Sequence, residues 1–142
     1  MKLLVFGTTG QIATELQRRE DTAVVIRALG RHEADLSKPI SCEKAILNEE
    51  ADMIINLAAY TAVDRAEEEE DLANIVNGEA PAIMANAAAV QGIPFMHVST
   101  DYIFDGTGEE PWKIDSPANP LSVYGRSKLK GEEGVRACGG KY

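Results

Sequence analysis

The sequence predicts an α/β fold built on a doubly wound parallel sheet, and three observations favour this class. Short apolar runs alternate with longer segments of helical periodicity along the chain. The apolar runs are continuous and do not alternate with polar residues, as is typical of strands buried on both faces of a parallel sheet. A glycine turn follows the first run directly, as in the first unit of a mononucleotide-binding fold.

The first predicted strand and helix enclose this glycine turn. Residues 3–6 are apolar, Gly7-Thr-Thr-Gly10 follows, and from Ile12 apolar residues recur at helical spacing. Gly7 and Gly10 permit a tight turn and let backbone amides approach a pyrophosphate at the helix amino terminus. An ordinary strand–helix turn is the alternative, but the position right after an amino-terminal strand favours a dinucleotide.

The next strand, residues 23–29, is followed by a cation where a carboxylate for the adenosine ribose is usual. Arg31 in that place suits a 2′-phosphate and so NADPH, although a surface arginine is an equal alternative. Asp35 and Leu36 follow, where an adenine would be flanked. A helix over 39–50 and a third buried strand over 52–58 come next. Residues 59–64 then form a loop at the carboxyl end of that strand, the edge where open α/β sheets bind ligands.

The second half predicts one more strand and two helices. An acidic run at 67–71 begins a helix that is predicted to break near Asn77 and Gly78, to resume at Pro81 and to end at Gly92. Residues 95–98 form the fourth strand, with His97 assigned to the core or the sheet edge. A loop over 101–120 leads to a helix over 121–135. The chain stops where a fifth strand would start, so the sheet is predicted to be incomplete at the carboxyl end.

A hydroxyl and a phenol–ammonium pair are the predicted chemical groups. Thr100 and Asp101 stand at the end of the fourth strand. Tyr124 and Lys128 are four residues apart in the last helix, and this spacing places both on one helical face. A phenol beside an ammonium can act as a proton donor, because the positive charge favours the phenolate.

Composition bounds the class of protein. The 142 residues suit one domain, and the hydrophobic content of 44% with 26% charged residues is ordinary for a globular protein. The formal net charge of −9 argues against nucleic acid and anionic membranes as partners. No apolar run reaches membrane-spanning length, and two isolated cysteines suggest reduced thiols, so we expect a cytoplasmic protein. No metal site is predicted.

Four segments together, residues 6–12, 56–67, 99–106 and 120–132, resemble the dTDP-4-dehydrorhamnose reductases. This family belongs to the extended short-chain dehydrogenase/reductase superfamily, which has a Rossmann-type NAD(P)-binding domain. The resemblance implies reduction of a nucleotide-sugar 4-ketone, dTDP-4-dehydrorhamnose to dTDP-L-rhamnose, by hydride transfer from NADPH or NADH. It runs along all of residues 1–142 but covers only about the amino-terminal half of the family's length. The carboxyl-terminal substrate domain would then be absent, and we expect little activity from this chain alone.

The resemblance also implies roles for individual residues. Tyr124 would be the proton donor, Thr100 the hydroxyl that holds the substrate oxygen, and Lys128 the residue that binds the nicotinamide ribose. The positions implied for the coenzyme are Gly7, Gly10, Gln11, Ile12, Arg31, Asp35, Leu36, Ala59, Tyr60, Thr61, Tyr124 and Lys128. Those implied for the sugar nucleotide are Thr61, Val63, Thr100, Asp101 and Tyr102.

Two alternatives stay open. The chain could be a non-catalytic nucleotide-binding relative, although a regulator need not keep Thr100, Tyr124 and Lys128. It could also be a nucleotide-sugar epimerase or dehydratase of the same superfamily. The choice between NADPH and NADH and the oligomeric state are open as well, and a homodimer is compatible with the resemblance.

Overall fold

A computed structural model describes all residues, 1–142, and confirms the predicted fold class. The four strands are β1 (Lys2–Phe6), β2 (Val25–Leu29), β3 (Met53–Asn56) and β4 (Phe95–His97). They form one parallel sheet in the order β2-β1-β3-β4. The chain therefore builds outward from β1 in both directions, and the crevice between the carboxyl ends of β1 and β3 is the switch point of a doubly wound sheet.

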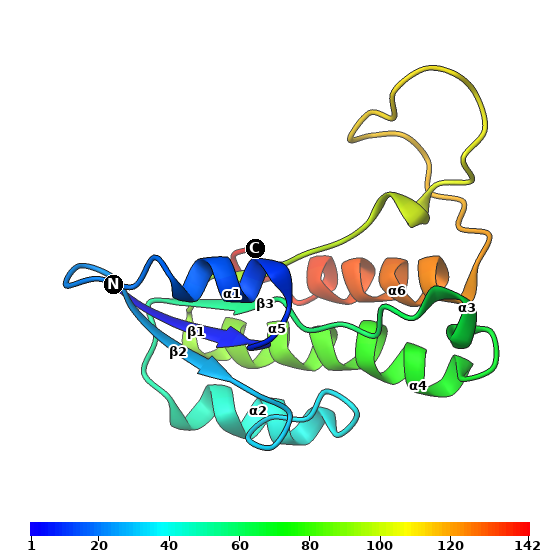
Figure 1. Cartoon of the computed structure of the whole chain (residues 1–142). Helices are drawn as coiled ribbons and strands as arrows, with labels where there is room; N and C mark the ends of the chain where they lie inside the picture. Colours follow the sequence, from blue (N-terminus) through cyan, green and yellow to red (C-terminus); the bar gives the residue numbers. More distant parts are fainter.

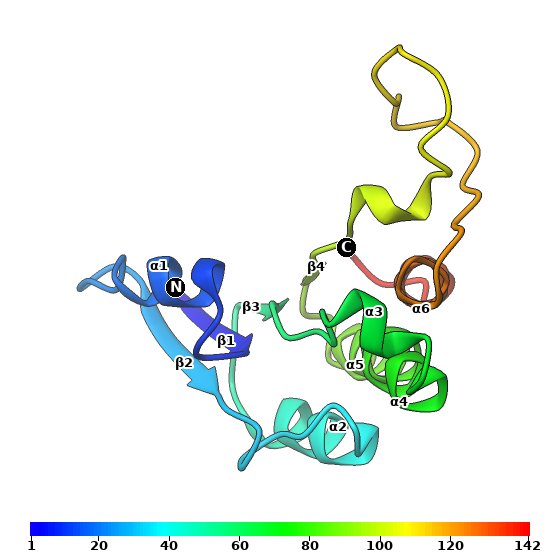
Figure 2. The same ribbon diagram turned by 45° about the vertical axis from the view of Figure 1, so that its right-hand side comes forward.

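Helices cover the sheet unequally. The helical segments are α1 (Gln11–Gln17), α2 (Pro39–Asn48), α3 (Val63–Ala66), α4 (Glu70–Asn74), the π-helical η1 (Ile75–Glu79), α5 (Ala80–Gln91), the 3₁₀ turn η2 (Asp101–Ile103) and α6 (Val123–Ala137). α1 lies on one face, while α2 and α5 lie on the other with α6 beside α5 (Figures 1 and 2). No helix is both long enough and apolar enough to cross a membrane.

Alternate residues of β1 explain why its sequence is uniformly apolar. Leu4 and Phe6 point into the larger core, which α2 and α5 close with residues such as Ile46 and Met84. Leu3 and Val5 point the other way, into the smaller cluster toward α1. Because both faces of the strand are buried, neither set of positions can be polar.

The predicted break near Asn77 and Gly78 is absent, because α4, η1 and α5 form one unbroken helical run (Figure 1). The chain accommodates Pro81 by widening the helix locally: the amide of Ala80 donates to the carbonyl of Ile75, five residues back. Pro81, which has no amide hydrogen, follows immediately. A π turn of this kind is common near functional sites.

The carboxyl-terminal side of the sheet is open. β4 is an edge strand, and its outer side is met only by the last residues of the chain, where the amide of Phe95 donates to the carbonyl of Lys141 at 2.9 Å. Met96 on this strand is 46% exposed. The edge strand β4 therefore leaves an apolar side chain exposed at the side of the sheet.

Candidate functional site

The glycine turn after β1 contains two glycines that differ in what surrounds them. Gly7 has a φ of +106°, and a Cβ there would lie 3.2 Å from the backbone nitrogen of Ala58. The fold itself therefore requires glycine at position 7. Gly10 caps α1 with an ordinary φ of −69°, and a Cβ there would meet nothing within 4 Å. The missing side chain at Gly10 keeps open a space that no other part of the chain fills.

Gly10 lines a pocket of about 340 Å³ at the carboxyl ends of β1, β2 and β3. Of the residues predicted to hold a coenzyme, those that line it are Gly7, Gly10, Arg31, Asp35, Leu36, Ala59 and Thr61. Gln11 and Ile12 begin α1 outside the lining, and the Ile12 side chain is 57% exposed. Seven residues predicted from separate stretches of sequence thus meet around one cavity.

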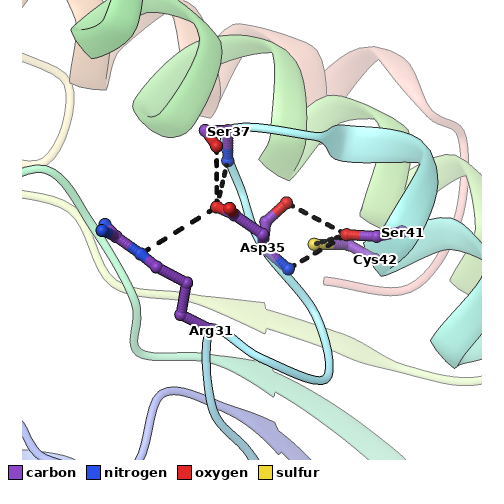
Figure 3. A network of polar contacts seen from close by, with 5 residues as sticks. All are labelled: Arg31, Asp35, Ser37, Ser41 and Cys42. Carbon is purple, nitrogen blue, oxygen red and sulfur yellow. Dashed lines mark hydrogen bonds and ion pairs between the residues drawn. The ribbon is translucent and has the colours of Figure 1, made fainter.

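One end of the pocket carries a fixed carboxylate, Asp35, and an exposed cation, Arg31, beside it (Figure 3). The Oδ1 atom of Asp35 accepts hydrogen bonds from the Ser37 amide at 3.0 Å and the Ser37 hydroxyl at 2.8 Å. Burial alone would raise the pKa of Asp35, but the bonds from Ser37 together with the charges of Arg31 and Lys38 outweigh it, and the pKa lies below its usual value. The Nε atom of Arg31 is 4.0 Å from Asp35 Oδ1, and its side chain is 81% exposed. Arg31 is therefore held loosely and can turn toward a ligand.

Tyr60 lies between two residues that line the pocket but is not itself part of the lining. Its hydroxyl donates to Glu69 at 2.6 Å, and this hydrogen bond raises the pKa of Tyr60. Its amide donates to the side-chain oxygen of buried Asn77, and its carbonyl accepts from the nitrogen of the same side chain. Asn77 also donates to the Ser127 hydroxyl of α6 at 3.0 Å. One buried amide thus ties the loop after β3 to the helix that carries Tyr124.

The segment after β4 lies on the first turn of α6. Thr100 caps η2, since its hydroxyl accepts from the amide of Tyr102 at 3.2 Å and donates to the Asp101 carboxylate at 3.2 Å. The rings of Tyr102 and Tyr124 meet edge to face with centroids 5.4 Å apart. Gly125 makes this approach possible, because a Cβ there would lie 2.2 Å from the carbonyl oxygen of Tyr102. The segment that carries Thr100 and Asp101 therefore contacts the turn of α6 that carries Tyr124, through Tyr102.

Lys128 is a buried cation at the centre of this region, with 2% of its surface exposed. Its Nζ atom donates to the carbonyl of Val98 and lies 3.2 Å from the Nε2 atom of His97. Burial lowers the pKa of Lys128 to about 8, although the nearby carboxylate of Glu132 opposes the shift. Lys128 is therefore close to its titration point at neutral pH.

Sequence reasoning placed His97 in the core or at the sheet edge and gave Asn56 no role. The structure connects both to Lys128, since Asn56 Nδ2 is 3.2 Å from His97 Nδ1 and the Asn56 side-chain oxygen accepts from the amide of Ala58. Burial and the charge of Lys128 lower the pKa of His97 to about 3. The sequence does contain one sign of this connection, because Asn56 and His97 are each a polar residue at the end of an otherwise apolar strand.

Comparison with known proteins defines the family. A family model described as the RmlD substrate binding domain matches residues 1–142. The chain belongs to the RmlD substrate-binding domain family. It is 42% identical, over its whole length, to a dTDP-4-dehydrorhamnose reductase of Burkholderia thailandensis, of which it covers 48%. The chain thus spans about half the length of the curated relatives it matches.

Solved structures agree with this membership. A dTDP-4-dehydrorhamnose reductase from Clostridium acetobutylicum superposes with a TM-score of 0.92 at 36% identity, over 97% of this chain and 50% of that one. Another, from Bacillus anthracis in complex with NADP, has a TM-score of 0.93 at 30% identity, over 99% of this chain and 50% of that one. Relatives of this RmlD domain are therefore reductases, and one of them holds NADP in its crystal structure.

Proposed function

We propose that the protein to which these residues belong reduces the 4-ketone of a nucleotide-linked sugar with NADPH or NADH, with Tyr124 as proton donor. The relatives' names point to dTDP-4-dehydrorhamnose as substrate, and reduction of its 4-ketone would give dTDP-L-rhamnose. The observation that carries the proposal is the open space at Gly10, in a pocket at the same sheet edge as Tyr124 and Lys128.

The pocket fits a dinucleotide in chemistry as well as in position. The turn from Gly7 to Gly10 would hold the pyrophosphate, because backbone amides at the start of a helix favour anions. Asp35 and Leu36 would flank the adenosine, and exposed Arg31 suits a 2′-phosphate. Ala59 and Thr61 line the path toward β3 and η1. Gln11, Ile12 and Tyr60 would contribute from outside the lining.

The residues of β4, η2 and α6 would supply the proton and the orientation. When bound, the reduced nicotinamide supplies the hydride. The Tyr124 hydroxyl would give its proton to the ketone oxygen as that oxygen becomes an alcohol, and the Thr100 hydroxyl would hydrogen-bond to the same atom. Lys128 would stabilise the phenolate left on Tyr124 and bind the nicotinamide ribose. Positioned acid catalysis of this kind contributes about 10²- to 10⁴-fold.

The sugar nucleotide would approach the surface around η2. Asp101 and Tyr102 are exposed there, next to half-buried Thr100. Thr61 and Val63 lie at the start of α3, in the loop that Asn77 ties to α6 through Tyr60 and Ser127. These residues form the part of the proposed substrate site that the chain contains.

A coenzyme titration followed by nicotinamide fluorescence tests the pocket. We expect saturable NADPH binding that Gly10→Asp abolishes, because the new carboxylate fills the space and repels the pyrophosphate. Val90→Asp is the matched control, since Val90 is 82% exposed on α5 and the substitution adds the same charge away from the pocket. Equal binding by wild type and Gly10→Asp would contradict the proposal.

Product analysis separates the reductase from its superfamily relatives. A reductase consumes one coenzyme for each 4-ketone lost. A dehydratase, in which Asp101 beside Thr100 would serve as the acid, releases water without net consumption of coenzyme, and an epimerase likewise consumes none.

A further inference from the structure

The buried side chain of Asn56 connects the backbone after β3 to the imidazole of His97 on β4. Its amide could in principle face either way, because its oxygen accepts and its nitrogen donates. The neighbour on one side decides the orientation. The amide of Ala58 can only donate, and it lies 3.1 Å from the oxygen of Asn56. The Asn56 nitrogen is therefore the atom that faces His97 Nδ1 at 3.2 Å.

This orientation fixes the tautomer of His97. A donor from Asn56 requires Nδ1 to accept, so in the neutral ring the hydrogen resides on Nε2. The ring is neutral, because its burial lowers the pKa to about 3. The Nε2–H group then points at Lys128 Nζ, 3.2 Å away.

A donor at Nε2 distinguishes between the two forms of Lys128. An ammonium has three donors and no acceptor, so it would set an N–H against an N–H at this contact. A neutral amine has a lone pair that can accept from His97 while its own hydrogen bonds to the carbonyl of Val98. We infer that Asn56 and His97 are positioning residues that stabilise the neutral amine of Lys128 through the Nε2–H tautomer of His97.

Other charged groups around Lys128 do not supply this preference. Glu132, one turn later on α6, favours the ammonium. Glu79 on η1 is paired with Lys130 instead, at 3.3 Å. Asp101 on η2 accepts from Thr100, and Tyr124 lies one turn before Lys128 on the same helix. His97 and the burial of Lys128 therefore both favour the neutral amine, whereas Glu132 favours the ammonium.

The consequence for catalysis rests on the proposed function. In that function Lys128 must carry a positive charge to stabilise the phenolate of Tyr124. The contacts from Asn56 to His97 and from His97 to Lys128 influence the pH at which this charge is lost. Removing these contacts should extend the active form of the enzyme to higher pH.

The tautomer itself can be measured without coenzyme or sugar, so a failure of the proposed function and a failure of this inference are distinguishable. The chain has two histidines, and exposed His32 serves as an internal reference for the imidazole ¹⁵N shifts. At a pH well above the Lys128 pKa of about 8, where the amine is mostly neutral, we expect His97 to show the Nε2–H tautomer. An Nδ1–H tautomer would overturn the inference.

Two variants test the coupling to Lys128. Asn56→Asp replaces the donor by an acceptor, so we expect His97 to move its hydrogen to Nδ1 and the Lys128 pKa to rise by about one unit, read from the ¹³Cε shift of labelled lysine. Glu132→Gln changes a charge on the other side, and it should lower the Lys128 pKa with the His97 tautomer unchanged. If Asn56→Asp alters neither the tautomer of His97 nor the titration of Lys128, then Asn56 does not act on Lys128 through His97.

Discussion

Gly7 and Gly10 stand three residues apart in one turn, and each is glycine for a different physical reason. Gly7 needs its positive φ and its close approach to the backbone at Ala58, whereas Gly10 needs neither. We predict that Gly7→Ala lowers the free energy of unfolding by about 1–3 kcal/mol, because a side chain there is both strained and crowded. Gly10→Ala should leave stability nearly unchanged. Urea unfolding of both variants checks this, and equal losses would contradict it.

The titration of His97 makes the free energy of unfolding of the chain depend on pH in the acid range. Its pKa falls from an ordinary 6.5 to about 3 in the folded protein. Between these values the unfolded chain binds a proton that the native chain does not, so stability is lost as pH falls through this window and is regained as pH rises. The expected slope is about 1 kcal/mol per pH unit.

Histidine variants isolate that slope. His97→Gln should flatten the pH dependence of the free energy of unfolding in this window. His32→Gln is the control, since His32 is exposed and its removal should change little. Urea midpoints measured across the acid range would refute the assignment if the two variants behaved alike.

At the scale of elements, close packing of α6 on its neighbours positions the proposed proton donor. A Cβ on Gly125 would collide with the backbone of η2, and one on Gly131 would lie 2.2 Å from the carbonyl oxygen of Asn77. Both glycines cost α6 intrinsic helix stability, by about 1 kcal/mol each relative to alanine. Close contacts of α6 with η2 and η1, which only glycine permits at these two positions, offset that loss.

The Gly125→Ala variant therefore tests whether the close contact with η2 or the intrinsic helix propensity dominates the stability at this position. Propensity alone predicts stabilisation, but the 2.2 Å approach to Tyr102 predicts a net loss of about 1–3 kcal/mol and displacement of η2. Glu133→Ala, at an exposed position of the same helix, should be neutral or stabilising. A stabilised Gly125→Ala variant, measured by urea unfolding, would show that α6 and η2 are not packed as described.

Element types were predictable from the sequence, whereas contacts across elements were not. The continuous apolar runs at residues 3–6 and 52–58 indicated strands buried on two faces, and hence a parallel sheet, whereas the run at 95–98 forms an edge strand with Met96 exposed. The break predicted near Asn77 failed because Pro81 is normally incompatible with a helix interior, and sequence spacing does not reveal a π turn that accommodates it. The link from His97 to Lys128 joins residues 31 positions apart, and no local pattern encodes it.

At the scale of the whole molecule, the two halves of the proposed site follow from sheet topology. The glycine turn after β1, the loop after β3 and the segment after β4 all begin at the carboxyl edge of one parallel sheet. Both parts of the proposed site therefore begin at the same edge of the sheet. A pocket of about 340 Å³ is small for a whole dinucleotide. The chain also spans about half of its relatives, with 48% of the Burkholderia thailandensis reductase covered.

The measurement that tests the central claim most directly compares Tyr124→Phe with wild type in two assays on the protein to which these residues belong. The first is NADPH binding, and the second is coenzyme oxidation driven by a dTDP-linked 4-keto sugar. We predict unchanged binding with a turnover reduced about 10²- to 10⁴-fold, because the variant keeps the ring and loses only the hydroxyl that would donate the proton. Wild-type turnover in Tyr124→Phe would contradict the assignment of Tyr124 as proton donor.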